Sequence, residues 1–159
     1  MSKIINFYNR KKRSTIDAGQ SKAAVVKSFS SKGLVSFEFT IDDLNNLTDA
    51  LLYYSGYVGD QADTATATKD KEIAIRRKSY LTKLSLHIQE KSKNFNSPIT
   101  LSLNNDDIGC ISESLLYYSG FIGEQTNTVE SKLEKENIWS KKSTLIQLYT
   151  KISEYYSLE

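Results

Sequence analysis

The strongest restriction on the fold of this chain is an internal repeat with a period of about 64 residues. Residues 35–95 align with residues 99–159 without a gap, and about 19 of the 61 aligned pairs are identical. The best-preserved stretch, Leu-Leu-Tyr-Tyr-Ser-Gly, occupies residues 51–56 and again residues 115–120. A repeat at a fixed period indicates one supersecondary unit built twice, and two copies are too few for a solenoid. The sequence therefore predicts two similar units that share one core and are related by a pseudo-two-fold axis.

Each repeat unit begins with a strand pattern. Apolar side chains alternate with other residues over 35–39 and over 99–103, which is the period of a half-buried strand. Pro98 precedes the second run, where its missing N–H does least harm. Two strands related by a two-fold axis pair most simply as an antiparallel sheet. A further strand is expected at residues 23–26, joined to the first by a short turn.

A long helix is predicted after each strand. Thr40 and Asn104 are the expected N-caps, because each is followed three residues later by an aspartate, as in a capping box. Apolar residues then recur at alternating spacings of three and four, which is the spacing of a heptad seam. The seam consists of Leu44, Leu47, Leu51, Tyr54 and Val58 in the first copy and of Ile108, Ile111, Leu115, Tyr118 and Ile122 in the second.

Two glycines occur in each of these helical patterns. Gly56 and Gly120 lie within the apolar seam, so we expect them inside the helix. A glycine there costs about 1 kcal/mol relative to alanine, and close approach of a neighbouring helix would offset that cost. Gly59 and Gly123 suit the position just after a helix, and the first helix of each unit is therefore predicted to end there.

After a polar loop, a second helix is predicted over about residues 69–91 and about residues 129–156. Short loops make each helix pair an antiparallel hairpin. The predicted fold is mainly α (α+β), with four helices in two hairpins and a small antiparallel sheet. We divide the chain into a basic, flexible arm at residues 1–21, a first repeat unit at residues 22–96 and a second at residues 97–159.

Charge is distributed unevenly along the chain. Residues 1–34 contain 8 basic and 1 acidic side chains, a net +7, whereas residues 35–159 contain 13 basic and 18 acidic ones, a net −5. A basic arm on an acidic body is typical of a polyanion contact or of an arm that folds onto its own body. Two basic clusters follow in the second helices. The nucleic-acid-binding candidates are Arg10, Lys11, Lys12, Arg13, Arg76, Arg77, Lys78, Lys141 and Lys142.

Residue types that carry catalysis are scarce. The chain has one histidine, His87, and one cysteine, Cys110, too few for a soft-ligand zinc site. Cys110 near a helix start could have a lowered pKa, but no pattern brings it to His87. The aspartate pairs at 42–43 and 106–107 could bind a cation or act as acid and base, although helix capping already explains them. We therefore expect no enzyme, no metal and no cofactor, and an unrecognised carboxylate site is the third hypothesis.

The leading hypothesis is a non-enzymatic, cytoplasmic protein-binding module, such as an adaptor, inhibitor or regulator. The sequence leaves two oligomeric states open, a monomer with internal pseudo-symmetry or a homodimer. The repeated tyrosine motif supports the leading hypothesis, because tyrosine is favoured at interfaces, although a purely structural role fits the repetition too. The alternative is a DNA- or RNA-binding accessory protein that uses the basic arm. No apolar run is long enough for a membrane span, and the Lys-, Asn- and Ile-rich composition is compatible with a mobile element or phage. The protein-binding candidates are Tyr53, Tyr57, Tyr117 and Phe121.

Overall fold

The computed structural model describes residues 33–93 and 98–156 and shows a mainly helical chain with a small two-stranded sheet. This confirms the fold class predicted from the repeat. The basic arm and the strand expected at residues 23–26 lie outside the described residues. In chain order the elements are β1 (Val35–Phe39), α1 (Ile41–Thr64), α2 (Thr68–Ser92), β2 (Ile99–Leu103), α3 (Asn105–Glu124), the 3₁₀-helix η3 (Gln125–Asn127) and α4 (Lys132–Ser153).

The two strands, one from each repeat unit, pair antiparallel as predicted. Phe37 lies opposite Leu101, which is its own counterpart in the repeat. The pseudo-two-fold axis therefore passes between these two residues. Next to them, the hydroxyl oxygens of Ser36 and Ser102, which also pair across the sheet, lie 3.0 Å apart in a hydrogen bond.

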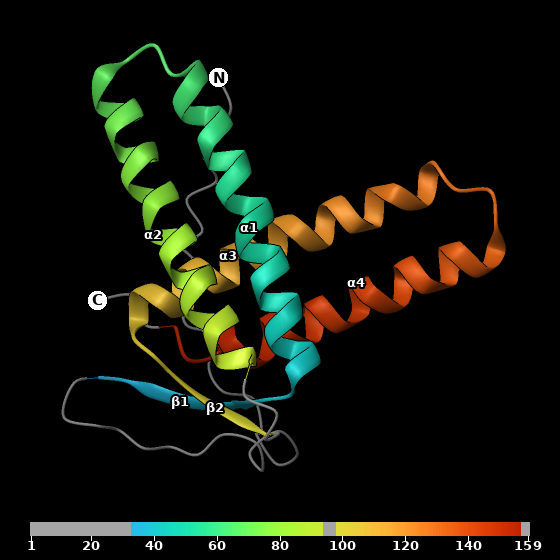
Figure 1. Ribbon diagram of the computed structural model, residues 1–159. Helices are drawn as coiled ribbons and strands as arrows, with labels where there is room; N and C mark the ends of the chain where they lie inside the picture. The colour runs from blue at the N-terminus through green and yellow to red at the C-terminus, as the bar shows by residue number, and fades with distance from the viewer. Residues whose placement is uncertain (1–32, 94–97, 157–159) are drawn as a thin grey trace.

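The four helices form two hairpins, α1 with α2 and α3 with α4 (Figure 1). α1 crosses α3, and beyond this crossing the hairpins diverge, so that their loop ends point in different directions (Figure 1). The sheet lies at the opposite end of the molecule from the loop of the first hairpin. This arrangement leaves the C-terminal halves of α1 and α3 facing an open angle between the hairpins.

Both long helices begin as the capping pattern predicts. The Asp43 N–H donates to Thr40 Oγ1 at 3.1 Å, and the Thr40 N–H donates to Asp43 Oδ2 at 2.9 Å. Asn104 and Asp107 form the same reciprocal pair at the start of α3. Each box satisfies two N–H groups that a helix end would otherwise leave without a partner.

All ten positions of the predicted apolar seam are buried. Leu51 in α1 and its counterpart Leu115 in α3 are both fully buried, and each contributes about 1.5–3 kcal/mol by leaving water. Phe37 and Leu101 from the sheet belong to the same continuous core. The two repeat units therefore share one core, and neither forms a core of its own.

Gly59 lies inside α1, which continues to Thr64, so the prediction that this helix ends there is wrong; α3 ends at Glu124, next to Gly123, as predicted. A Cβ atom at Gly59 would lie 2.9 Å from Nζ of Lys78, and one at Gly123 would lie 2.7 Å from Nζ of Lys142. Each glycine thus makes room for a lysine of the second helix of its own hairpin. In α1 the buried positions continue past Gly59 to Ala62, which is why this helix does not stop there.

Gly56 and Gly120 lie inside the helices, as predicted, but the reason expected for them is wrong. Both are exposed, and a Cβ atom added at either position would meet nothing within 4 Å. Close packing against the described helices therefore does not explain them. Each leaves a bare stretch of helix backbone facing outwards.

Candidate functional site

Six aromatic rings meet where α1 crosses α3, and we call them the aromatic cluster. They come from the repeated Leu-Leu-Tyr-Tyr-Ser-Gly segments and the residue after each, and they include all four residues predicted to bind a protein. Contacts between rings of different helices hold the crossing together. The members are Tyr53, Tyr54 and Tyr57 of α1 and Tyr117, Tyr118 and Phe121 of α3.

The ring contacts of the aromatic cluster follow the symmetry of the repeat. The ring centroids of Tyr53 and Phe121 lie 4.7 Å apart, and those of their counterparts Tyr117 and Tyr57 lie 5.1 Å apart. Ring pairs at this separation add about 0.5–1.5 kcal/mol beyond the area they bury. Part of the repeated motif is therefore structural, because it fastens one hairpin to the other.

The cluster has a buried layer and a partly exposed layer. Tyr54 and Tyr118 belong to the seam and are buried, whereas the other four rings are partly open to solvent. Phe121 has 38% of its surface exposed. Burial raises the pKa of Tyr53 and of Tyr117 above the ordinary phenol value. The outer layer offers rigid rings with polar edges, which is the chemistry of protein interfaces.

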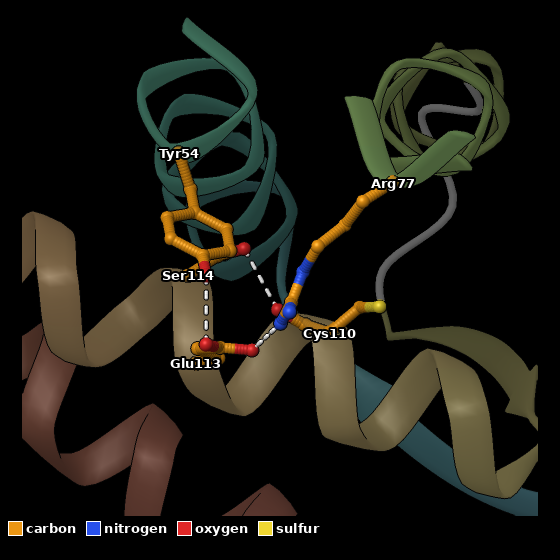
Figure 2. Close-up of polar contacts among 5 residues, drawn as sticks. All are labelled: Tyr54, Arg77, Cys110, Glu113 and Ser114. Atoms are coloured by element: carbon orange, nitrogen blue, oxygen red, sulfur yellow. Dashed lines mark hydrogen bonds and ion pairs between the residues drawn. The ribbon is translucent and has the colours of Figure 1, made fainter. Parts of the chain in front are cut away.

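A buried polar network lies beside the cluster (Figure 2). Glu113 of α3, which is only 4% exposed, forms an ion pair with Arg77 of α2. Its other oxygen accepts a hydrogen bond from Tyr54 Oη of α1 at 2.7 Å. The Arg77 guanidinium also lies 5.5 Å from the centroid of the Tyr54 ring, a cation–π distance. Three helices from both repeat units meet at this carboxylate.

The repeat places a more solvated version of this network on the other side. Asp49 corresponds to Glu113, and Lys141 corresponds to Arg77. Lys141 Nζ lies 3.8 Å from Asp49 Oδ2 and 5.3 Å from the centroid of the Tyr118 ring. Lys141 and Asp49 are 39% and 50% exposed, against 22% and 4% for Arg77 and Glu113. The same cross-repeat contact is therefore buried in one half and open in the other.

The helix-borne residues predicted to bind nucleic acid are placed in different settings. Arg77 and Lys141 have the acidic neighbours just described. Lys78 and Lys142 pass over the glycines of the facing helices. Arg76 is exposed on α2. Two of these five cations are thus directed at carboxylates of this chain.

The other nucleic-acid candidates, at residues 10–13, lie outside the described residues. A phosphate contact by this arm stays a prediction from the charge pattern. Four of the five helix-borne candidates lie against carboxylates or glycines of neighbouring helices, and Arg76 is exposed.

Candidate catalytic side chains do not come together. Burial raises the pKa of the Cys110 thiol to about 11, against a smaller lowering by Arg77, so the lowered pKa suggested by its place near a helix start is wrong. His87 is exposed on α2, and Asp42 and Asp106 are exposed in the first turns of their helices. Within residues 33–93 and 98–156, no group of three His, Cys, Asp or Glu side chains could hold a metal ion.

Sequence reasoning missed Glu113 as a site residue. One signal was available, because Glu113 is the sole charged residue between Ile108 and Gly123. A lone carboxylate in such an apolar stretch of helix requires a partner once it is buried. The partner, Arg77, comes from the other repeat unit, and no periodicity within one helix could identify it.

Comparisons with protein-family models, with curated proteins and with solved structures find no match for this chain. In the part of the chain that the structure describes, no helix combines the length and the apolar character needed to cross a membrane.

Proposed function

We propose that this chain is a non-enzymatic protein-binding module that contacts its partner through the exposed layer of the aromatic cluster. The observation that carries the proposal is the position of this layer. Tyr53, Tyr57, Tyr117 and Phe121 lie at the crossing of α1 and α3, and each ring is partly exposed. The module would act in the cytoplasm as an adaptor, inhibitor or regulator, and its single cysteine makes no disulfide there.

The two exposed glycines support the same surface. Gly56 lies three residues after Tyr53 and Gly120 three residues after Tyr117, so each glycine is one helical turn from a ring of the exposed layer. Each costs about 1 kcal/mol of helix stability, and no neighbour among residues 33–93 and 98–156 accounts for it. A partner whose backbone approaches these bare turns would use the space that a side chain would otherwise occupy.

The test is capture of a protein from a lysate of the source cells with the tagged full-length chain. The wild-type chain is expected to retain a protein in stoichiometric amount, and nuclease treatment should not release it. The double variant Tyr53→Ala/Phe121→Ala is expected to lose that protein while keeping a cooperative unfolding transition. Rigid aromatic anchors account for about 2 kcal/mol or more each at such surfaces, so at least a tenfold weaker retention is expected.

The chain supplies a matched control in Ile75→Ala/Trp139→Ala. These residues are also apolar, exposed and related by the repeat, but they lie on α2 and α4, away from the cluster. The control variant should retain the partner. Equal loss in both variants, recovery of nucleic acid in place of protein, or no retained protein at all would each reject the proposal.

A further inference from the structure

An open groove runs between the first turns of α1 and the middle of α4. Its volume is about 490 Å³. The walls are polar, with amide, hydroxyl and carboxylate groups and one lysine. The lining residues are Asp42, Asn45 and Asn46 of α1 and Asn137, Ser140, Lys141 and Thr144 of α4.

Every lining residue of this groove has a counterpart in the other half of the molecule. The period of the repeat maps the α1 wall onto α3 and the α4 wall onto α2. The counterpart residues also lie together, because Arg77 is close enough to Cys110 to shift its pKa. The counterparts are Asp106, Gly109 and Cys110 of α3 and Ile73, Arg76, Arg77 and Tyr80 of α2.

In the other half, the side chain of Tyr80 fills the site between α2 and α3 that corresponds to the groove. The ring is partly buried, and burial is the main cause that raises the pKa of its phenol. Its hydroxyl donates to Oδ1 of Asp107, whose Oδ2 accepts from the N-cap Asn104. A tyrosine between α2 and α3 therefore donates a hydrogen bond to Asp107, the aspartate of the α3 capping box.

The half of the molecule with the open groove retains the acceptor, next to the lining residue Asp42, but lacks the ring. Thr144 stands where the repeat has Tyr80, so the smaller side chain leaves room above α4. Asp43 is the counterpart of Asp107, and its Oδ2 accepts from the N-cap Thr40 in the same way. Its Oδ1 is thus equivalent to the oxygen that accepts from Tyr80.

We propose that the groove between α1 and α4 binds a tyrosine side chain of the protein partner. The ring would lie over Thr144, as the Tyr80 ring lies in the other half, and its hydroxyl would donate to the carboxylates at Asp42 and Asp43. The amides of Asn45 and Asn46 are suited to hydrogen bonds with the peptide backbone next to that tyrosine. This inference rests on the proposed protein-binding function and names one side chain that the partner must present.

The test uses N-acetyl-L-tyrosinamide as the probe and the full-length ¹⁵N-labelled protein in NMR titrations. Saturable shifts are expected at the amides of Asn45, Asn46 and Thr144, with half-saturation at roughly 1 mM, the range set by the size of the probe. N-acetyl-L-phenylalaninamide, which lacks the hydroxyl, should bind at least about threefold more weakly, since it leaves the carboxylate unused.

Thr144→Tyr gives the open half the residue that the other half already carries, and it should abolish the shifts. Thr150→Tyr, on an exposed turn of the same helix, is the matched control and should leave them unchanged. Should Thr144→Tyr fail to fold, Ser140→Trp blocks the groove from an exposed position and serves the same purpose.

Three results would overturn the inference. The first is no saturable shift up to about 50 mM probe, which is fifty times the expected half-saturation. The others are equal binding of the phenylalanine probe and shifts that persist in a blocked variant. Any of these with partner capture intact removes the groove and leaves the proposed function standing. A failed capture experiment removes the function itself, whatever the probe does, so the two failures can be told apart.

Discussion

At the scale of single residues, Glu113 and Asp49 show how a repeat diverges. The two acids occupy equivalent positions and face equivalent cations, yet one pair is buried and the other solvated. Pairing strength depends on solvent access, because a carboxylate removed from water needs its partner far more than an exposed one does. The pair therefore supplies an internal comparison with the same fold on both sides.

Glu113→Ala is expected to lower the free energy of unfolding by about 3–5 kcal/mol, since it removes the carboxylate facing the partly buried Arg77 and the acceptor of the Tyr54 hydroxyl. Asp49→Ala should cost less than about 1 kcal/mol, because its ion pair is exposed. Urea unfolding followed by circular dichroism measures both. Equal losses in the two variants would contradict the buried network.

Cys110 is expected to be inert in the folded protein. Its pKa is raised from 9.0 to about 11, so its thiolate fraction at pH 8 is roughly 100-fold below that of the unfolded chain. Labelling with a thiol reagent at pH 8 should be slowed at least in that proportion and restored by denaturant. Labelling of the native protein at the unfolded rate would disprove the burial.

The same shift makes stability depend on pH. A folded-state pKa above the unfolded value means that the folded protein holds its proton more tightly, so the contribution of Cys110 is complete below about pH 9 and is lost as the pH rises through 11. The free energy of unfolding should fall over that window. Cys110→Ala should fall less steeply, with the remainder coming from tyrosines.

At the scale of elements, the glycines of α1 separate two reasons for having no side chain. Gly56→Ala is expected to stabilise the protein by about 1 kcal/mol, because nothing obstructs the added methyl group. Gly59→Ala should gain little or nothing, because its Cβ would meet Lys78 and displace that side chain. Thermal unfolding measures both changes, and Gly120→Ala with Gly123→Ala repeats the comparison in α3. A larger gain at Gly59 than at Gly56 would show that Lys78 imposes no restraint.

Most elements were predictable because their signals are local. The capping boxes at Thr40 and Asn104 and the seam through Leu51 depend on spacings within one helix, and the structure confirms them. The end of α1 was not predictable from Gly59, because a glycine that fits after a helix fits equally well beneath a lysine of the next helix. Choosing between these two needs the position of Lys78, which is a tertiary fact.

The site was predictable only in part for the same reason. The aromatic residues were found because a motif repeated them, but their division into a buried and an exposed layer depends on the angle at which α1 crosses α3. Likewise, the groove at Thr144 appears only when the two halves are compared in space. Residues from different repeat units form both features, and periodicity along the chain cannot pair them.

At the scale of the whole molecule, the shared core predicts that neither half is stable alone. Fragments 1–96 and 97–159 should each lack a cooperative unfolding transition as monomers, because each exposes the seam that the other covers. Mixing the two fragments should restore the helical circular dichroism of the intact chain. A fragment that unfolds cooperatively as a monomer would refute the shared core.

The axis between Phe37 and Leu101 has one more consequence. A surface with exact two-fold symmetry would bind an asymmetric partner equally well in two orientations related by the axis. Here the ion pair of Glu113 is mostly buried, and Tyr80 fills the space beside it. The ion pair of Asp49 is exposed to solvent, and a groove is open at Thr144. The two sides of the α1–α3 crossing are therefore chemically different. A partner that contacts both sides at once binds in one preferred orientation.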